Sequence, residues 1–197
     1  MPIRQPESFL HWNYFLALES DLERLSRYVE FTEHNFHTYS IEIAHLLLAT
    51  ASEVDVVAKK LCARHRPKPK AEGINAYCDV LKTAYPDMGQ MEVSVPRYGL
   101  SLMPWDKWRK NEPPQWWSDH NKVKHHRSDH FHAAHLQNVL NAMGALFIVA
   151  VLLYKGETER HWIAPVPVLF NAPKELAKQS LVAGVGHPVL HFTELYS

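Results

Sequence analysis

Residues 116–127 read Trp-Trp-Ser-Asp-His-Asn-Lys-Val-Lys-His-His-Arg, and a long, largely apolar segment follows them after a short polar stretch. Two consecutive prolines precede this block, so we expect a helix to begin after them. On that helix Asn121 and His125 stand four residues apart, which places an amide and an imidazole on one face. Positive charge surrounds the pair, from Lys122, Lys124 and Arg127. Imidazoles that titrate near neutrality beside fixed cations suit acid–base work on a phosphodiester.

The composition limits the class of protein. With 197 residues, of which 46% are hydrophobic, the chain can form one domain with a sizeable core. A formal net charge of zero argues against a polyanion binder that works by bulk electrostatics, although fourteen histidines would make the chain basic on mild acidification. Cys62 and Cys78 show no metal-type spacing, which indicates free thiols in a reducing compartment.

No apolar run of the kind found in a secretory signal stands at the N-terminus. The longest apolar stretch, residues 145–154, has about half of the roughly 20 residues that a membrane span needs. We therefore expect a cytoplasmic protein that does not use a membrane.

Apolar residues at spacings of three and four predict amphipathic helices at about 8–33, 40–65 and 73–85. A fourth helix carries the block at 116–127. Ser128 has the character of an N-cap for a fifth helix, which runs to about residue 155 and is apolar nearly all round in its second half.

Two further segments interrupt or follow this helical pattern. Between residues 91 and 105, apolar and polar residues alternate around a Pro-Arg-Tyr-Gly turn, which predicts a small hairpin. Beyond residue 156 the periodicity is lost. The expected fold is all-α: an antiparallel bundle of four to five helices over residues 1–155 with a β-hairpin insertion, and an irregular C-terminal extension over residues 156–197.

The run His120-Asn121-Lys122-Val123-Lys124-His125, placed before a long apolar helix, resembles the Arg-Asn-x-x-x-His element of the HEPN superfamily. The resemblance covers residues 8–155 as a pattern of helices, and the motif itself is six residues long. It implies a helical bundle. Many members of the superfamily are metal-independent ribonucleases, several of them toxins or defence proteins, and they generally act as homodimers in which the two motifs meet at the interface.

Carried over by position, His125 matches the catalytic histidine of the superfamily and Asn121 its polar partner. In that scheme His125 transfers the proton of a ribose 2′-hydroxyl, which attacks the adjacent phosphorus to give a cyclic phosphate. Lys122, Lys124 and Arg127 would hold the phosphate, with no metal or cofactor.

This chain departs from the motif at its first position. His120 stands where the superfamily usually has arginine, whose permanent charge and bidentate grip a neutral imidazole does not reproduce. His120 could take that role only when protonated. Members without the full motif are often non-catalytic binding proteins, so the fold and the activity separate at this residue.

Glu53 lies on the inner face of the second predicted helix, at spacings of three and four from Thr50 and Val57. A buried carboxylate requires a partner. We expect Glu53 to orient the site by pairing with Lys124, Arg127 or a histidine of the motif; the alternative is a half-exposed glutamate at the end of the bundle.

Two other interpretations compete for the aromatic and histidine residues. The i, i+4 spacing of His126 and His130, and the i, i+3 spacing of His132 and His135, would suit zinc, but nearby cations and the lack of a carboxylate-rich motif lead us to expect no metal. The tryptophans of this region could stack on bases, yet their proximity to prolines favours packing in the core; they are Trp105, Trp108, Trp116 and Trp117.

The sequence thus predicts an HEPN-like RNA-binding protein, with metal-independent endoribonuclease activity as its enzymatic form, acting in stress response or defence. The expected partners are a second copy of the chain, RNA or a nucleotide, and a cognate antitoxin or other partner protein. The alternative is a non-catalytic module of the same fold that binds a nucleotide, RNA or protein. A third interpretation is a structural or regulatory protein without a ligand site.

Overall fold

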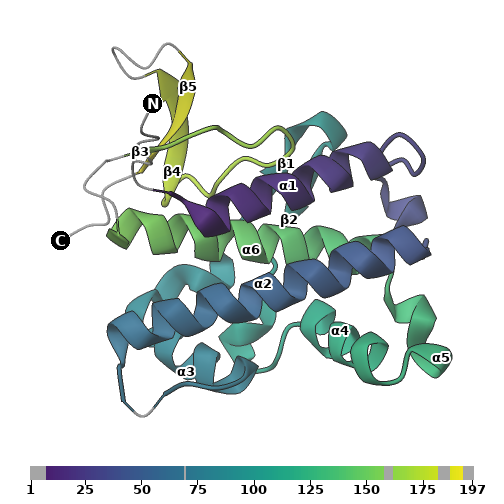
Figure 1. Ribbon diagram of the computed structural model, residues 1–197, viewed down its shortest axis with the longest axis horizontal. Coiled ribbons are helices and arrows are strands. Elements are labelled where there is room, and N and C mark those ends of the chain that lie inside the picture. The colour runs from purple at the N-terminus through teal and green to yellow at the C-terminus, as the bar shows by residue number, and fades with distance from the viewer. Residues whose placement is uncertain (1–7, 69, 158–161, 182–186, 193–197) are drawn as a thin grey trace, which may run out of the picture.

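The computed structural model describes residues 8–68, 70–157, 162–181 and 187–192, which are predominantly helical (Figure 1). This part of the chain forms six α-helices: α1 (Leu10–Leu25), α2 (Ile41–His65), α3 (Ile74–Ala84), α4 (Gln115–His125), α5 (Arg127–His130) and α6 (Leu136–Glu157). The long helices α1, α2 and α6 pack on one another, and α3 and α4 contact α2 (Figure 1). The helical class is as predicted, but more helices are present than the four to five expected.

Helix α6 is the centre of the core. Its residues from Ala145 to Leu153 are at most 2% exposed. By length and composition Leu136–Lys155 could cross a membrane, but 89% of that window is buried inside the molecule, as in the core helix of a compact bundle. Phe147 of α6 stacks on Phe15 of α1 at 5.1 Å between ring centroids. Aromatic pairs of this kind add about 0.5–1.5 kcal/mol beyond the burial of their surface.

The boundaries of α2 follow from local chemistry. The hydroxyl of Ser40 accepts a hydrogen bond from the amide of Ile43 at 3.2 Å and so caps the helix. Helix α1 ends at Leu25, eight residues before the predicted end, because Phe31 turns inward and packs on Tyr98 at 4.8 Å. The burial of that one ring outweighs the helical periodicity of residues 26–33.

The predicted hairpin is confirmed. Strands β1 (Val93–Val95) and β2 (Leu100–Leu102) pair in an antiparallel ladder. Gly99 closes the turn in the left-handed region, with φ of 63°, which costs glycine little. An isolated bridge joins Ser94 to Asn171, so the hairpin also contacts the C-terminal segment.

The prediction of an irregular C-terminal extension was wrong. Strands β3 (Trp162–Ile163), β4 (Ala177–Leu181) and β5 (Pro188–Phe192) form an antiparallel sheet in the order β3-β5-β4. Strands β4 and β5 are consecutive, but β5 also pairs with the two-residue strand β3 from earlier in the chain. Strands this short, with glycines and a proline between Leu181 and Phe192, leave no clear periodicity, which is why the sequence pattern did not reveal the sheet.

Glu19 of α1 attaches this segment to the bundle. Its carboxylate is 2% exposed and accepts hydrogen bonds from three consecutive backbone amides at 2.8–3.3 Å, those of Val168, Leu169 and Phe170. Burial raises the pKa of Glu19, and the hydrogen bonds from the three amides lower it without cancelling that rise, to which the charge of Glu23 adds.

The prediction that Ser128 caps the last long helix was also wrong. Arg127–His130 forms the single turn α5, residues Phe131–Ala133 form a short 3-10 helix, and α6 begins only at Leu136. The chain is extended at His135, which forms a β-bridge with Tyr39. The amides of Leu136 and Gln137 then donate to the carbonyls of Thr38 and Phe36, so tertiary contacts satisfy the first turn of α6.

Cys62 and Cys78 are free, as expected, and both are buried. Burial raises the pKa of the Cys62 thiol to about 11, so it is not a nucleophile near neutral pH.

Candidate functional site: helix α4 and its surroundings

Helix α4 presents one face to the core. Trp116, Trp117, Asp119, His120 and Val123 are buried on it. The four tryptophans of this region expose 8% or less and contact one another, with ring centroids 4.2 Å apart for Trp105 and Trp108. The packing role predicted for them is confirmed, and it holds α4 in a defined orientation.

The end of α4 is exposed and positively charged. We call residues Lys124, His125, His126 and Arg127 the basic turn; all four are exposed. Within the described part of the chain, neither Lys124 nor Arg127 takes part in an ion pair. The carbonyl end of a helix carries partial negative charge, which favours cations at this position.

Asn121 and His125 both lie on α4, four residues apart, as predicted. Asn121 is half-buried and His125 is exposed. Among the described residues the Asn121 side chain has no hydrogen-bond partner, so its amide is available to a ligand. Lys122 is close to this face, but it donates to Asp119 at 2.8 Å.

His120 points to the other side. It is 5% exposed, and its ring lies 5.5 Å from that of Trp117. Burial, with the charges of Lys124 and His125, lowers the pKa of His120 to about 4. The imidazole is therefore neutral near pH 7 and does not supply the positive charge that arginine would bring to this position.

The expected pairing of Glu53 with the motif was wrong. Its carboxylate lies 2.6 Å from Nδ1 of His11, on α1. The backbone amide of His11 in turn donates to the Tyr154 hydroxyl of α6 at 2.9 Å. Glu53 therefore joins α2 to α1, and α1 contributes the partner because it packs directly against α2.

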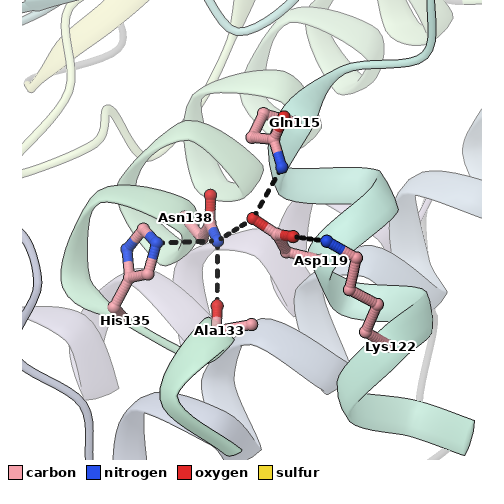
Figure 2. A network of polar contacts seen from close by, with 6 residues as sticks. All are labelled: Gln115, Asp119, Lys122, Ala133, His135 and Asn138. Atoms are coloured by element: carbon pink, nitrogen blue, oxygen red, sulfur yellow. Dashed lines mark hydrogen bonds and ion pairs between the residues drawn. The ribbon is translucent and has the colours of Figure 1, made fainter. Parts of the chain in front are cut away.

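Asp119 is the centre of a buried polar network that the sequence did not single out (Figure 2). Its Oδ2 accepts from the side-chain amides of Gln115 and Asn138, both at 3.0 Å, and Oδ1 accepts from Lys122. Asp119 is 7% exposed and Asn138 is 3% exposed. The network connects α4 to the first turn of α6.

Asn138 Nδ2 also approaches the Ala133 carbonyl at 2.8 Å and Nε2 of His135 at 3.2 Å (Figure 2). The two hydrogens of the Asn138 amide face three acceptors, so one hydrogen is shared between two acceptors. We assign Nε2 of His135 as an acceptor, which leaves the ring proton on Nδ1.

Three donors keep Asp119 ionised. Burial alone would raise its pKa, but the hydrogen bonds from Lys122, Gln115 and Asn138, together with the charge of Lys122, outweigh burial and hold the pKa below its usual value. Spacing could have indicated part of this arrangement, since Gln115 and Lys122 stand four before and three after Asp119 on one helix. The contribution of Asn138, nineteen residues away, could not be read from local spacing.

Two cavities lie beside the network. One, of about 410 Å³, is lined mainly by ionisable side chains: His37, Asp119, Lys122, His130, His132 and His135. The other, of about 780 Å³, shares His37, Asp119 and His135 and continues along β2 and α6. Polar groups gathered around a concave surface are the usual character of a small-ligand site.

The metal interpretation finds no support in the described residues, where no three His, Cys, Asp or Glu side chains are placed to hold one ion. The rings of His126 and His130 are 6.5 Å apart across the break between α4 and α5. A continuous helix, which the i, i+4 zinc spacing requires, is not formed there.

Comparison with family models, curated proteins and solved structures yields no match.

Proposed function

We propose that this chain binds RNA as an HEPN-like protein, through the basic turn and the adjoining face of α4. The observation that carries the proposal is the exposure of Lys124 and Arg127 without an ion pair in the described structure. Permanent cations of this kind, next to an exposed imidazole, are suited to phosphodiester oxygens.

Local charge, rather than total charge, is what the proposal requires. The chain is formally neutral, so attraction to a polyanion must come from a patch. Each phosphate neutralised on a single strand releases counterions and lowers the logarithm of the affinity by about 0.7 per tenfold rise in salt.

RNA cleavage without a metal is the second candidate, favoured by the placement of Asn121 and His125 on one accessible face. His125 would take the proton of a ribose 2′-hydroxyl, and the resulting oxygen would attack phosphorus. The bond from phosphorus to the 5′-oxygen would break to give a cyclic phosphate, and the leaving oxygen would receive a proton from a protonated imidazole, for which His125 of the second copy in a homodimer is the candidate. The neutral His120 does not stabilise the charge that develops on the phosphoryl oxygens. Lys124 and Arg127 would have to do so, which is why we rank binding above cleavage.

The resemblance also carries proposals on assembly and location. An HEPN-like homodimer would place two basic turns at one interface, and analytical ultracentrifugation at several protein concentrations would detect it. We place the protein in the cytoplasm, where free thiols such as Cys62 and Cys78 stay reduced. A cognate antitoxin or other partner protein would compete with RNA for the same face.

A mobility-shift assay with 5′-labelled single-stranded RNA in EDTA tests the function. We expect the wild-type protein to shift the RNA, and Lys124→Ala/Arg127→Ala to weaken binding at least tenfold. The matched control is Arg66→Ala/Lys68→Ala, which removes one arginine and one lysine at the far end of α2, whose 25 residues span about 37 Å.

The same gel reports cleavage. Products that persist in EDTA but disappear in His125→Ala and Asn121→Ala support the nuclease. Intact RNA that is shifted by the wild type supports the non-catalytic binding module. Absence of any shift, or equal loss in both double variants, contradicts the proposed function.

A further inference from the structure

The cavity of about 410 Å³ beside Asp119 has no role in the function proposed above. We call it the histidine pocket and define it by His37, Lys122, His130, His132 and His135, with Asp119. These residues come from four parts of the chain: the segment before α2, α4, the α5 turn with its short 3-10 continuation, and the residue before α6. Folding therefore brings together four imidazoles that are spread over 99 positions of sequence, from 37 to 135.

The carboxylate of this pocket is already satisfied. Asp119 receives three hydrogen bonds, one of them from Lys122. Lys122 uses one of its three ammonium hydrogens in that contact, and its side chain is 48% exposed. The pair is neutral as a unit, so the imidazoles decide the charge of the pocket.

Neighbouring imidazoles oppose the protonation of His135. Burial lowers the pKa of His135, and the nearby His37 and His132 lower it further, while Asp119 and the Phe36 backbone act in the opposite direction. The His37 and His135 rings are 5.4 Å apart. An anion among them would turn this repulsion into attraction.

The groups that face the pocket contain more donors than acceptors. Tyr39 adds a hydroxyl from the segment before α2. Among the described residues that line the pocket only Asp119 carries negative charge, and its oxygens accept hydrogen bonds from Gln115, Lys122 and Asn138; Asp129 of α5 is exposed and does not line the pocket. A tetrahedral oxyanion, with acceptors on every side, matches this arrangement better than a cation or an apolar ligand.

We propose that the histidine pocket is a phosphate-binding site in which anion binding is coupled to proton uptake. The inference rests on the proposed function in one respect, because RNA or a nucleotide supplies the phosphate. Histidine rings mark a path to it from the basic turn: His125, His126, His130 and His132 follow at 6.5, 6.5 and 6.3 Å between ring centroids. An RNA strand that is bound at the basic turn can therefore continue into the histidine pocket.

Titration with inorganic phosphate, and separately with sulfate, tests the site. Sulfate keeps its charge between pH 6 and pH 8, so any change in its affinity reports the protein. We expect sulfate to bind at least tenfold more weakly at pH 8 than at pH 6, because the proposed site takes up protons together with the anion. His130→Gln/His132→Gln should weaken both anions at least tenfold at pH 6, whereas His65→Gln, on the distant end of α2, should not.

The pKa of His135, followed by NMR through its Cε1 proton, provides the readout that a merely structural role would not change. Phosphate should raise that pKa, since binding of the anion and of the proton are reciprocal. An unchanged His135 titration, or equal binding by the His130/His132 double variant, overturns the proposal.

Two further measurements are needed. One identifies the source of the phosphate, and the other distinguishes failure of the histidine pocket from failure of the proposed function. Adenosine should not raise the His135 pKa, adenosine 3′-monophosphate should do so if the ligand is a free nucleotide, and a single-stranded RNA should do so if the ligand is a chain. Lys124→Ala/Arg127→Ala should lose RNA but keep inorganic phosphate. Phosphate binding without any RNA binding would refute the proposed function and leave the histidine pocket in place.

Discussion

The buried face of α4, here called its inner side, and its exposed C-terminal end with the turn that follows, here called its outer side, carry ionisable residues in opposite states. On the inner side Asp119 is 7% exposed and bonded to three donors, and His120 is buried and neutral. On the outer side Lys124 and Arg127 are exposed and lack an ion pair in the described structure. The inner side stabilises the junction of α4 with α6, and the outer side is available to a ligand. Residue type alone therefore does not identify the functional groups of this helix; exposure and pairing do.

Removal of the inner carboxylate should have the largest effect. Asp119→Ala leaves the buried amide of Asn138 without one acceptor and Lys122 without its partner. We expect a loss of about 3 kcal/mol in the free energy of unfolding, measured by urea denaturation. Asp129→Ala removes an exposed carboxylate on the neighbouring α5 turn and should change stability by less than about 0.5 kcal/mol. Equal losses in the two variants would show that the network does not stabilise the junction.

The outer side should instead govern the salt dependence of RNA binding. With Lys124→Ala/Arg127→Ala, two phosphate contacts are lost, so the slope of log affinity against log salt should become shallower by about 1.4. The affinity near physiological salt should fall by about tenfold to a hundredfold. The thermal unfolding midpoint should stay the same, because neither side chain is buried. A lower affinity with an unchanged slope would contradict direct phosphate contact.

His120 allows a test of the inner side through pH. Its folded-state pKa of about 4 lies below the ordinary histidine value of 6.5, so the unfolded chain binds more protons between these values. Stability should be fully present above pH 6.5 and decrease as the pH falls toward 4.

His120→Gln should reduce this loss of stability at low pH. Thermal unfolding at several pH values measures it, since each kcal/mol of stability shifts the unfolding midpoint by about 2–4 °C in a chain of this size. The pKa values of His65 and His135 are lowered as well, so a residual slope should remain. An identical pH profile in variant and wild type would show that His120 is not the group responsible.

Chelation should have the smallest effect. Because no three suitable side chains in the described structure converge on one point, we expect EDTA to change the RNA affinity less than twofold. A larger change would point to a metal held by the histidines of the outer side. Restoration by zinc or by magnesium would then distinguish nitrogen ligands from phosphate oxygens.

Part of the site was predictable from local spacing. The helix over Gln115–His125, the common face of Asn121 and His125, and the packing of the tryptophans all follow from residue type and helical period. The inward direction of His120 did not, because its neighbours at the motif are polar and its burial depends on packing against Trp117. The partner of Glu53 was also out of reach, since His11 lies 42 residues away.

The sequence by itself determined the helical class, the end of α2 before its prolines, the hairpin, and the concentration of cations at residues 122–127. These features depend on backbone conformation and on contacts within one or two turns, which local residue order controls. Only the tertiary structure decided the rest: the sheet of β3, β4 and β5, the network around Asp119, and the gathering of His37 with His130, His132 and His135. The network and the gathering of histidines require segments distant in sequence to meet, and the sheet requires strands too short to leave a pattern, so local residue order does not specify them.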